Sequence, residues 1–289
     1  MRLDVWGVRG SIPAPGPSTN RYGGNTPCVS VIDANGHLCV IDMGTGVVSL
    51  GTAVLQKTLP IAEDFGAGAG EATVLLSHGH WDHIQGFPFF APVFIPGNTL
   101  NIYGNARSAD RVEAVLEGQM NPQFSPIYTL KNLGAKINFE GIREEQCFRV
   151  SNLEICSMEL PHGETTALAF QIKEQGKTLV YASDVGYPIA GASDAIIEFY
   201  QGAEVLIHDS TYTPEEQEER RYRGLSSYLE AAAVAHRAQV GKLVLFHYDQ
   251  DHSDDTVDEN VRKCGQELER LGAGQIEVVG AFEGMRLEI

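Results

Sequence analysis

Three histidines and one aspartate crowd into six residues of the stretch LLSHGHWDHIQG. They are His78, His80, Asp82 and His83, and they follow an apolar run typical of a β-strand. Imidazole and carboxylate groups are common ligands of transition metals. A single histidine after a strand is usually a hydrogen-bonded structural residue, but this density of ligand-type side chains indicates a metal site. The rest of the chain must then supply further ligands and the elements that position them.

Five apolar runs in the chain each end in a residue that can bind a metal. Those residues are His78, His162, Asp184, the pair His208 and Asp209, and His247. Strands of an open sheet present their ends at one edge, so these endings predict a common site. Imidazole and carboxylate without thiolate suit zinc, manganese or iron. Two such ions roughly 3.5–4 Å apart can hold a hydroxide between them and clamp a phosphoryl or acyl oxygen.

The elements that position these residues are expected to be mixed strands and helices. Strand-like runs at 3–8 and on both sides of Asn35-Gly36 predict an antiparallel meander, and Gln175-Gly176 marks a second hairpin. Helices are expected in three stretches, 108–118, 226–238 and 254–271. No linker or repeat separates the halves of the chain. We therefore expect an α/β fold, with one domain over residues 1–289 built from two sheet halves.

The composition is that of a globular protein with a sizeable core. The 289 residues are 43% apolar and 20% charged, and a chain of this length buries roughly three quarters of its unfolded surface. With 21 basic and 38 acidic residues, the net charge is -17. Such a charge repels polyanions and argues against a long nucleic acid as partner. A small anion can still bind where metal cations dominate the local charge.

The sequence gives no sign of a membrane segment or of a disulfide framework. No apolar segment reaches the roughly 18–20 residues of a membrane helix, and the opening MRLDVWGVRG carries Asp4 and Arg9 where a signal peptide would be apolar. We therefore expect a cytoplasmic protein with no membrane partner. The five cysteines are scattered and lack close CxxC pairs, which predicts core thiols rather than disulfides or a thiolate zinc site.

The stretch HGHWDH resembles the HxHxDH motif of the metallo-β-lactamase superfamily. His162, Asp184 and His247 follow in the order and approximate spacing of that family's remaining ligands. The segments WGVRGSIPAPG, YGGNTPCV, IDMGTG and LIHDSTYT extend the resemblance over nearly the whole chain and resemble its phosphodiesterase branch. The resemblance implies a four-layer αββα sandwich, in which two β-sheets lie face to face with helices outside.

The resemblance also implies which residues hold two divalent metal ions. One ion would be held by His78, His80 and His162, the other by Asp82, His83 and His247, and Asp184 would bridge them. Zinc is the foremost candidate, with manganese or iron as alternatives. A metal-bound hydroxide would attack phosphorus, with Asp82 orienting it.

Asp42, in IDMGTG, has two interpretations. It matches a family position that supports the metal ligands from behind, where a carboxylate fixes the tautomer of an imidazole. It is also a suitable turn residue before Gly44.

The resemblance to the family is weaker at the residue that would protonate the leaving group. LIHDST resembles a segment of the ribonuclease Z relatives with Asp209 in place of glutamate, whereas RGLSSYLEAAAVAH has Leu225 where they have histidine. Leucine cannot donate a proton. The donor would then be His208, His252, Tyr212 or water, unless the leaving group needs none; His252 lies in a polar loop and is expected to be exposed. The catalytic candidates are Asp82, His208 and Asp209.

The remaining segments favour a small substrate. We find no inserted arm of the kind that tRNA-processing relatives use, and WGVRGS and YGGNTPCV resemble enzymes of small cyclic phosphodiesters. Arg9 could reach a phosphate or be a turn residue. The acidic run after Thr213-Pro214 precedes Arg220, Arg221 and Arg223, which indicates a solvated helix or, alternatively, arginines that meet an anionic substrate. A homodimer is compatible with the sequence.

The leading hypothesis is a dinuclear metal-dependent phosphodiesterase of small or cyclic phosphodiesters. Hydrolysis of a carboxylic substrate, such as a lactone, thioester or β-lactam, would use the same ligands. A non-catalytic metal-binding member is a third hypothesis, which rests on Leu225. Iron-dependent sulfur or oxygen chemistry is a fourth, because the ligand set admits iron.

Overall fold

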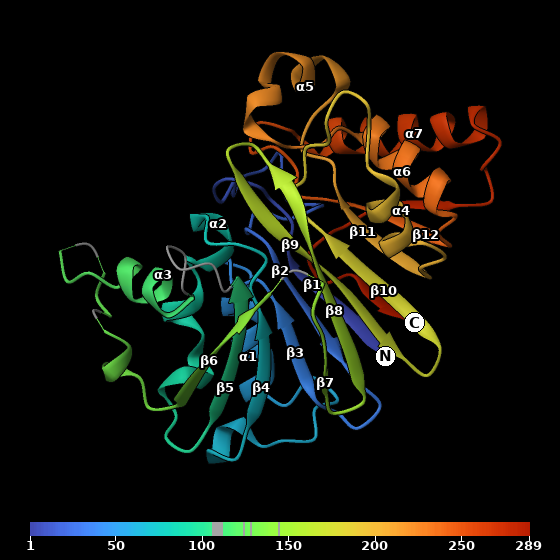
Figure 1. Ribbon diagram of the computed structural model, residues 1–289. Coiled ribbons are helices and arrows are strands. Elements are labelled where there is room, and N and C mark those ends of the chain that lie inside the picture. The colour runs from blue at the N-terminus through green and yellow to red at the C-terminus, as the bar shows by residue number, and fades with distance from the viewer. Residues whose placement is uncertain (106–111, 124, 128, 144) are drawn as a thin grey trace.

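Two seven-stranded β-sheets form the centre of the molecule, with helices on the outer face of each (Figure 1). The computed structural model describes residues 1–105, 112–123, 125–127, 129–143 and 145–289, and the statements below concern these residues. A shared apolar core joins the sheets, because Leu3 and Val29 of the first sheet cluster with Phe170 and Leu245 of the second. This is the αββα sandwich that the sequence resemblance implied.

The first sheet begins with the antiparallel meander predicted from the sequence. In order across the sheet, it contains β14 (Arg286–Glu288), β1 (Arg2–Gly7), β2 (Cys28–Ile32), β3 (Leu38–Ile41), β4 (Glu71–Leu75), β5 (Thr99–Asn105) and β6 (Lys136–Ile142). Strands β1 to β3 are antiparallel, and β3 to β6 are parallel. Asp33 closes the β2–β3 turn, since its carboxylate accepts hydrogen bonds from the backbone N–H groups of Asn35 and His37.

The second sheet repeats this mixture of antiparallel and parallel pairing. In order, it contains β13 (Glu277–Gly280), β12 (Lys242–Phe246), β11 (Val205–Asp209), β10 (Lys177–Ala182), β9 (Thr165–Glu174), β8 (Leu153–His162) and β7 (Cys147–Val150). Strands β10 to β13 are parallel. The predicted hairpin joins β9 to β10, and Gln175 and Gly176 both have positive φ angles, 50° and 79°, as a two-residue hairpin turn requires.

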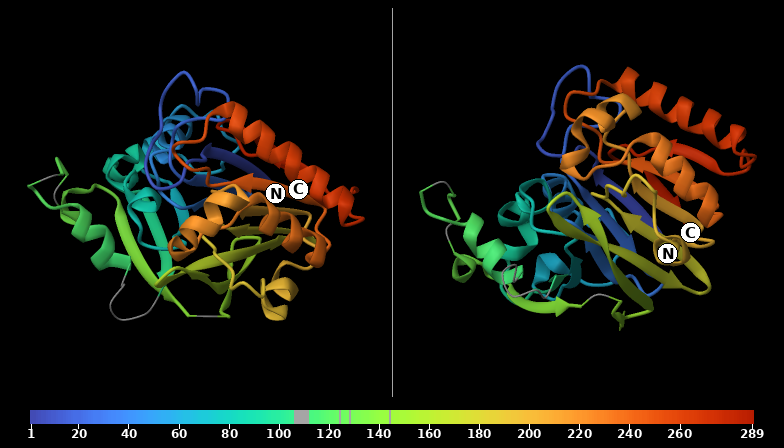
Figure 2. Two further views of the ribbon diagram at one scale, coloured as in Figure 1. Left: turned by 90° about the horizontal axis from the view of Figure 1, so that it is seen from above. Right: turned by 45° about the horizontal axis from the view of Figure 1, so that its top comes forward.

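Helices cover the outer faces of both sheets (Figure 2). The α-helices are α1 (Val47–Leu55), α2 (Trp81–Ile84), α3 (Val112–Gln119), α4 (Asp194–Tyr200), α5 (Pro214–Arg220), α6 (Tyr228–Ala238) and α7 (Asp254–Arg270). The 3-10 helices are η1 (Phe65–Ala67), η2 (Phe87–Phe89), η3 (Ala91–Phe94), η4 (Leu130–Asn132) and η5 (Arg221–Arg223). Apolar residues of α1 and α3 pack on the first sheet, and those of α4, α6 and α7 pack on the second.

The helices agree with the sequence prediction where the structure describes it. Helices α6 and α7 lie in the expected stretches 226–238 and 254–271, and Ser227 and Ser253 cap their N-termini. The third predicted helix, 108–118, is described from Val112 onward as α3, and its first residues lie outside the described part of the chain. Among the described residues, none of the helices has the length and apolar character needed to cross a bilayer.

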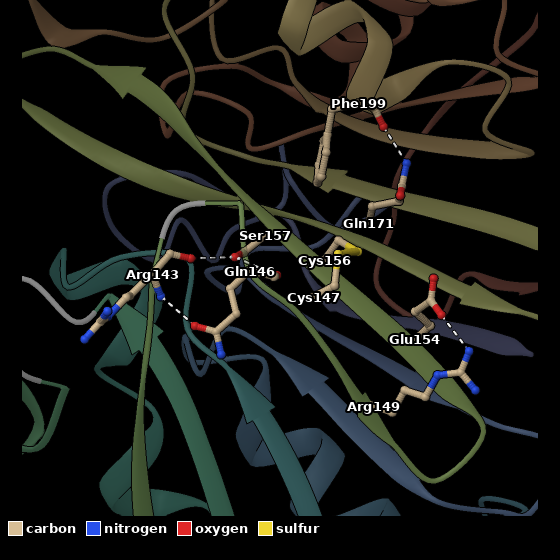
Figure 3. Close-up of a disulfide and its surroundings, with 9 residues drawn as sticks. All are labelled: Arg143, Gln146, Cys147, Arg149, Glu154, Cys156, Ser157, Gln171 and Phe199. Atoms are coloured by element: carbon tan, nitrogen blue, oxygen red, sulfur yellow. Dashed lines mark hydrogen bonds and ion pairs between the residues drawn. A yellow bond between two sulfur atoms is a disulfide. The ribbon is translucent and has the colours of Figure 1, made fainter.

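Two of the cysteines correct the prediction that all five are free core thiols. Cys147 on β7 and Cys156 on β8 lie directly opposite each other and form a disulfide (Figure 3). Their separation of nine residues gave no signal in the sequence, because the β7–β8 hairpin that pairs them was not foreseen. The prediction is confirmed for Cys28, Cys39 and Cys264, which are buried free thiols.

We expect the Cys147–Cys156 disulfide to stabilise the second sheet. Replacing both residues by serine should lower the free energy of unfolding by about 2–3 kcal/mol, because a closed loop of this length restricts the unfolded chain. Chemical denaturation of the two proteins measures this difference. Thiol titration of unfolded, unreduced wild-type protein should find only Cys28, Cys39 and Cys264 reactive; reaction of all five cysteines would contradict the disulfide.

Candidate metal centre

The ends of several strands meet at one edge of the two sheets and bring the predicted ligands together. His162 is the last residue of β8, while Asp184 and His247 follow β10 and β12. The other ligand candidates lie between β4 and the end of α2. The ligand atoms form two groups, each within 4.8 Å of one another: His78, His80 and His162 in one, and Asp82, His83, Asp184 and His247 in the other. The sequence resemblance implied the same grouping, except that it assigned Asp184 to both ions.

Asp184 lies between the two groups. Its Oδ1 atom is 3.8 Å from Nε2 of both His78 and His162, which belong to the first group. In the second group, Oδ2 is 3.0 Å from Nε2 of His83, and Oδ1 is 3.2 Å from Nε2 of His247. One carboxylate therefore faces both groups with its two oxygens, which is the position that a bridging ligand needs.

Four of the histidines are oriented by hydrogen bonds that involve Nδ1, on the side of the ring away from the other ligand candidates. The partners are Ser77 Oγ for His78 (3.1 Å), Asp42 Oδ2 for His83 (2.7 Å), the Gly224 carbonyl for His162 (2.8 Å) and Thr211 Oγ1 for His247 (2.9 Å). This leaves Nε2 of each ring facing the cluster, which consists of the two ligand groups together. Nε2 of His78 and of His83 is buried without a hydrogen-bond partner. A buried imidazole nitrogen that makes no hydrogen bond and faces carboxylates is a suitable metal ligand, so these residues fit divalent cations.

Asp42 supports the cluster and also occupies a turn. Its carboxylate accepts hydrogen bonds from the Ser77 backbone and hydroxyl (2.8 Å each), from His83 and from the Tyr181 hydroxyl (2.8 Å). Its φ angle is +58°. Both interpretations from the sequence therefore hold together: the turn after β3 aims the carboxylate at His83, and the contact fixes the ring.

Backbone conformations that are uncommon for residues other than glycine recur at this edge. Asp42, Asp184 and His247 have φ angles of 58°, 58° and 62°. Such conformations cost free energy and persist where the surrounding structure imposes them, often at functional sites. Here each follows a strand and turns the chain sharply enough to direct a side chain into the cluster.

The loop after β1 closes the second group. The backbone N–H of Ser11 donates to Asp82 Oδ2 at 2.8 Å. A Cβ atom on Gly10 would lie 2.4 Å from Cε1 of His247, so glycine is needed for the loop to approach this ring. Arg9 is fully buried and donates to the carbonyls of Gly23 (2.8 Å) and His252 (2.7 Å). Of the two interpretations of Arg9, these contacts contradict the one in which it reaches a phosphate.

Buried charges within the cluster shift the pKa values of its members. Burial lowers the pKa of His78 well below its usual range. At His247 burial acts in the same direction, but the carboxylates of Asp184 and Asp82 outweigh it and raise the pKa to about 9. At Asp184, burial acts to raise the pKa, but the neighbouring histidines outweigh it and hold the pKa well below its usual range. The carboxylates thus require positive neighbours, a role that a divalent cation can fill.

A cavity of about 260 Å³ opens on the cluster. Its described lining is Ser11, His80, Trp81, Asp82, His162, Asp184, Arg223, Leu225 and His247. Trp81 is 65% exposed, and Leu225 is buried at the wall. A second cavity of about 510 Å³ shares His80 with the first and also includes His78, Glu164 and Thr166. The site therefore offers room beside the ligands for a small molecule.

His208 lies behind the cluster and does not line the cavity. The side chain is fully buried, Nε2 accepts from the Tyr187 hydroxyl at 2.8 Å, and Nδ1 donates to the Asp209 carbonyl at 2.7 Å. Burial lowers the pKa of His208 to about 4. A neutral ring with both nitrogens occupied has no proton for a leaving group, so this geometry speaks against the predicted catalytic role of His208.

Asp209 also lies outside the cavity and contacts His247 through Thr211. Its Oδ1 atom accepts hydrogen bonds from the Thr211 backbone and hydroxyl, each at 2.9 Å, and that hydroxyl contacts His247. Burial raises the pKa of Asp209 to about 7. Asp209 is fully buried and does not line the cavity, so its contacts favour positioning of His247 over contact with substrate.

The other predicted proton donors are also withdrawn from the cavity. His252 is only 5% exposed and its Nε2 lies 2.9 Å from Glu216, so the expectation of an exposed His252 is wrong. Tyr212 is fully buried, and its hydroxyl accepts a hydrogen bond from Arg223. Neither residue lines the cavity.

Sequence reasoning missed several residues that hold the ligands. Ser77 and Thr211 stand beside recognised motif residues, and that position was the available signal. Tyr181 lies far from Asp42 in the chain, in a strand of the other sheet. Its role depends on how the two sheets pack, which no local pattern reveals.

We expect Asp42 to tune metal binding through His83. The Asp42→Asn substitution should weaken zinc affinity by about 10- to 100-fold, because it disturbs the contact that fixes the ring. Competition with a chromophoric chelator measures the affinity. Asp64→Asn is the matched control, since Asp64 pairs with Lys57 at the surface. Unchanged zinc affinity in a folded Asp42→Asn protein would show that this contact does not matter.

Comparison with known proteins places this geometry in a family. The family described as the beta-lactamase superfamily domain matches residues 39–248. A ribonuclease Z from Picrophilus torridus is 24% identical over 294 residues, which cover 88% of this chain and 87% of the relative.

Solved structures share the fold over the whole chain. The crystal structure of a diphosphatase from the PhnP family has a TM-score of 0.67 and 19% identity, and the match covers 100% of this chain and 97% of that one. The short form of human tRNase Z has a TM-score of 0.65 and 18% identity, with 100% and 99% covered. The family match spans every residue of the two ligand groups, and the fold agrees with it. The chain therefore belongs to the metallo-β-lactamase superfamily of metal-dependent hydrolases.

Proposed function

We propose that the protein hydrolyses small or cyclic phosphodiesters with two divalent cations, of which zinc is the foremost candidate. The observation that carries the proposal is Asp184, which lines a small cavity and whose two oxygens face both ligand groups. The first cation would be held by His78, His80 and His162, and the second by Asp82, His83 and His247. When bound, two such ions supply an activated water and positive charge for the phosphoryl oxygens.

Asp82 is the proposed orienting residue for the attacking water. Its carboxylate lines the cavity, and its Oδ2 atom is fixed by Ser11 N–H at 2.8 Å and lies 3.2 Å from Nε2 of His247. A carboxylate held in this way can accept a hydrogen bond from water and set its direction of approach. His208 and Asp209 are left with the positioning roles that their contacts favour.

The size of the cavity and the net charge of the molecule support a small substrate. The cavity at the cluster measures about 260 Å³, and the adjoining one about 510 Å³. The net charge of -17 opposes a long polyanion. A ribonuclease and a diphosphatase are among the similar proteins, and both names describe cleavage at phosphorus. A cytoplasmic location and a homodimer remain predictions from the sequence.

Leu225 restricts the leaving group. It lines the cavity and offers no proton, at a position where the resemblance to the ribonuclease Z relatives implies a histidine. Apart from the metal-ligand candidates, the described lining of this cavity holds no side chain that acts as an acid near neutral pH. We therefore propose that the substrate has a leaving group stable as an anion, or one that water can protonate.

A substrate panel tests the proposed function. Zinc-loaded protein is assayed with bis-p-nitrophenyl phosphate, cyclic nucleotides, a lactone and a chromogenic cephalosporin. We expect turnover of the phosphodiesters, fastest for the p-nitrophenyl leaving group because it needs no acid. Turnover of only the lactone or the cephalosporin would assign the site to carboxylic substrates, and metal binding without any turnover would favour a non-catalytic member.

The bridging position of Asp184 yields a separate prediction. Asp184→Ala should abolish turnover and release at least one metal ion per chain, because both ligand groups lose a shared carboxylate. Metal analysis of the purified variant measures the loss. Asp194→Ala serves as the control, because Asp194 is exposed on α4 and pairs with Arg237 at the surface. A variant at Asp184 that keeps both ions and the normal rate would refute the bridging assignment.

A further inference from the structure

Arg223 places a cationic side chain at the wall of the cavity of about 260 Å³ that opens on the metal-ligand candidates. It is exposed, and it lines the cavity together with Asp82, Asp184 and His247. Although the chain has 38 acidic residues, none of those described forms an ion pair with Arg223. Its neighbours differ, since Arg220 pairs with Asp249 at 3.4 Å and Arg221 lies 3.8 Å from Glu230. An arginine without a carboxylate partner is conspicuous in a protein of net charge -17.

Tyr212 holds one end of the Arg223 guanidinium. Nη1 of Arg223 donates to the Tyr212 hydroxyl at 3.1 Å, and Tyr212 is fully buried. Arg220 lies over the ring of the same tyrosine, 5.5 Å from its centroid. Tyr212 is therefore fixed on two sides. The remaining N–H groups of Arg223 have no acceptor among the described residues and are available to a ligand.

The backbone next to Arg223 is fixed to a metal-ligand candidate. The carbonyl of Gly224 accepts the hydrogen bond from His162 Nδ1 at 2.8 Å. Gly224 has a φ of +65°, and a Cβ atom there would lie 1.8 Å from the backbone nitrogen of Gly163. Only glycine allows this approach. The segment that carries Arg223 is thus held against the turn after β8, so the backbone from which this side chain extends has a fixed position relative to the cluster.

We propose that Arg223 binds the phosphoryl group of the substrate and that Tyr212 positions it. A guanidinium presents N–H groups in a fork that matches two phosphoryl oxygens, and such charge-assisted hydrogen bonds are among the strongest. Arginine stays protonated, so it stabilises negative charge on these oxygens and does not protonate the leaving group. This inference rests on the proposed function for the identity of the substrate, but it concerns the recognition of a phosphate anion.

Binding of inorganic phosphate tests the proposal without turnover. Isothermal titration of zinc-loaded protein with inorganic phosphate should show at least about tenfold weaker binding for Arg223→Gln, because one charged hydrogen-bonding group is lost. Arg223→Lys should recover part of the affinity, since it restores the charge without the fork. Arg221→Gln is the matched control and should bind as wild type, because Arg221 does not line the cavity. Wild-type affinity in Arg223→Gln, with equal zinc content, would overturn the proposal.

Kinetics separate this proposal from the proposed function. For bis-p-nitrophenyl phosphate, Arg223→Gln should lower kcat/KM by about 10- to 100-fold, whereas hydrolysis of the neutral ester p-nitrophenyl acetate should be unchanged. Tyr212→Phe keeps the cation and should lower kcat/KM for the diester alone, by a smaller factor. Equal losses on both substrates would overturn the role in phosphate recognition. Arginine-dependent phosphate binding without diester turnover would support it while refuting the phosphodiesterase function.

Discussion

The need to balance buried carboxylates governs the arrangement of this site. Asp82 and Asp184 are almost completely buried beside histidines, and isolated buried charges are costly unless they are paired. The rings of His78 and His83 turn Nε2 atoms that make no hydrogen bond toward the same region. Carboxylate oxygens and free imidazole nitrogens in one small volume provide charge and lone pairs for cations. The rest of the structure keeps these groups in place.

The supporting contacts explain why so much of the fold surrounds a few ligands. Asp42 joins both sheets at the cluster, because it contacts His83 from one sheet and Tyr181 from the other. Thr211 connects His247 to Asp209, and the Gly224 carbonyl holds His162. Ligand geometry is therefore set by the packing of the two sheets and by loops that reach across their common edge. Buried strands make this edge rigid enough to support strained turns such as those at Asp184 and His247.

The candidate ligands could be predicted because their signals are local, whereas the αββα architecture and the division of the ligands into two groups came from the family resemblance. HGHWDH and the polar residues after apolar runs identify strand ends, and Asn35-Gly36 identifies a turn. The environment of single side chains could not be predicted in this way. Arg9 and His252 stand in polar, turn-like stretches, yet packing of distant segments buries both. The Cys147–Cys156 pair likewise depends on the register of a hairpin, and burial and register are properties of the folded molecule.

The wall that carries Leu225 and Arg223 determines what kind of reaction this site can perform. A residue able to donate a proton helps a poor leaving group depart, whereas a fixed cation stabilises charge on the group that is attacked. Here the described wall supplies the cation, and apart from the metal-ligand candidates it supplies no proton donor. The pinning of Gly224 against Gly163 and the hydrogen bond from Arg223 to Tyr212 hold that cation beside the ligands. Under the proposed function, such an arrangement would favour anionic substrates whose leaving groups depart without assistance, and contacts with the phosphoryl oxygens would then contribute to selectivity.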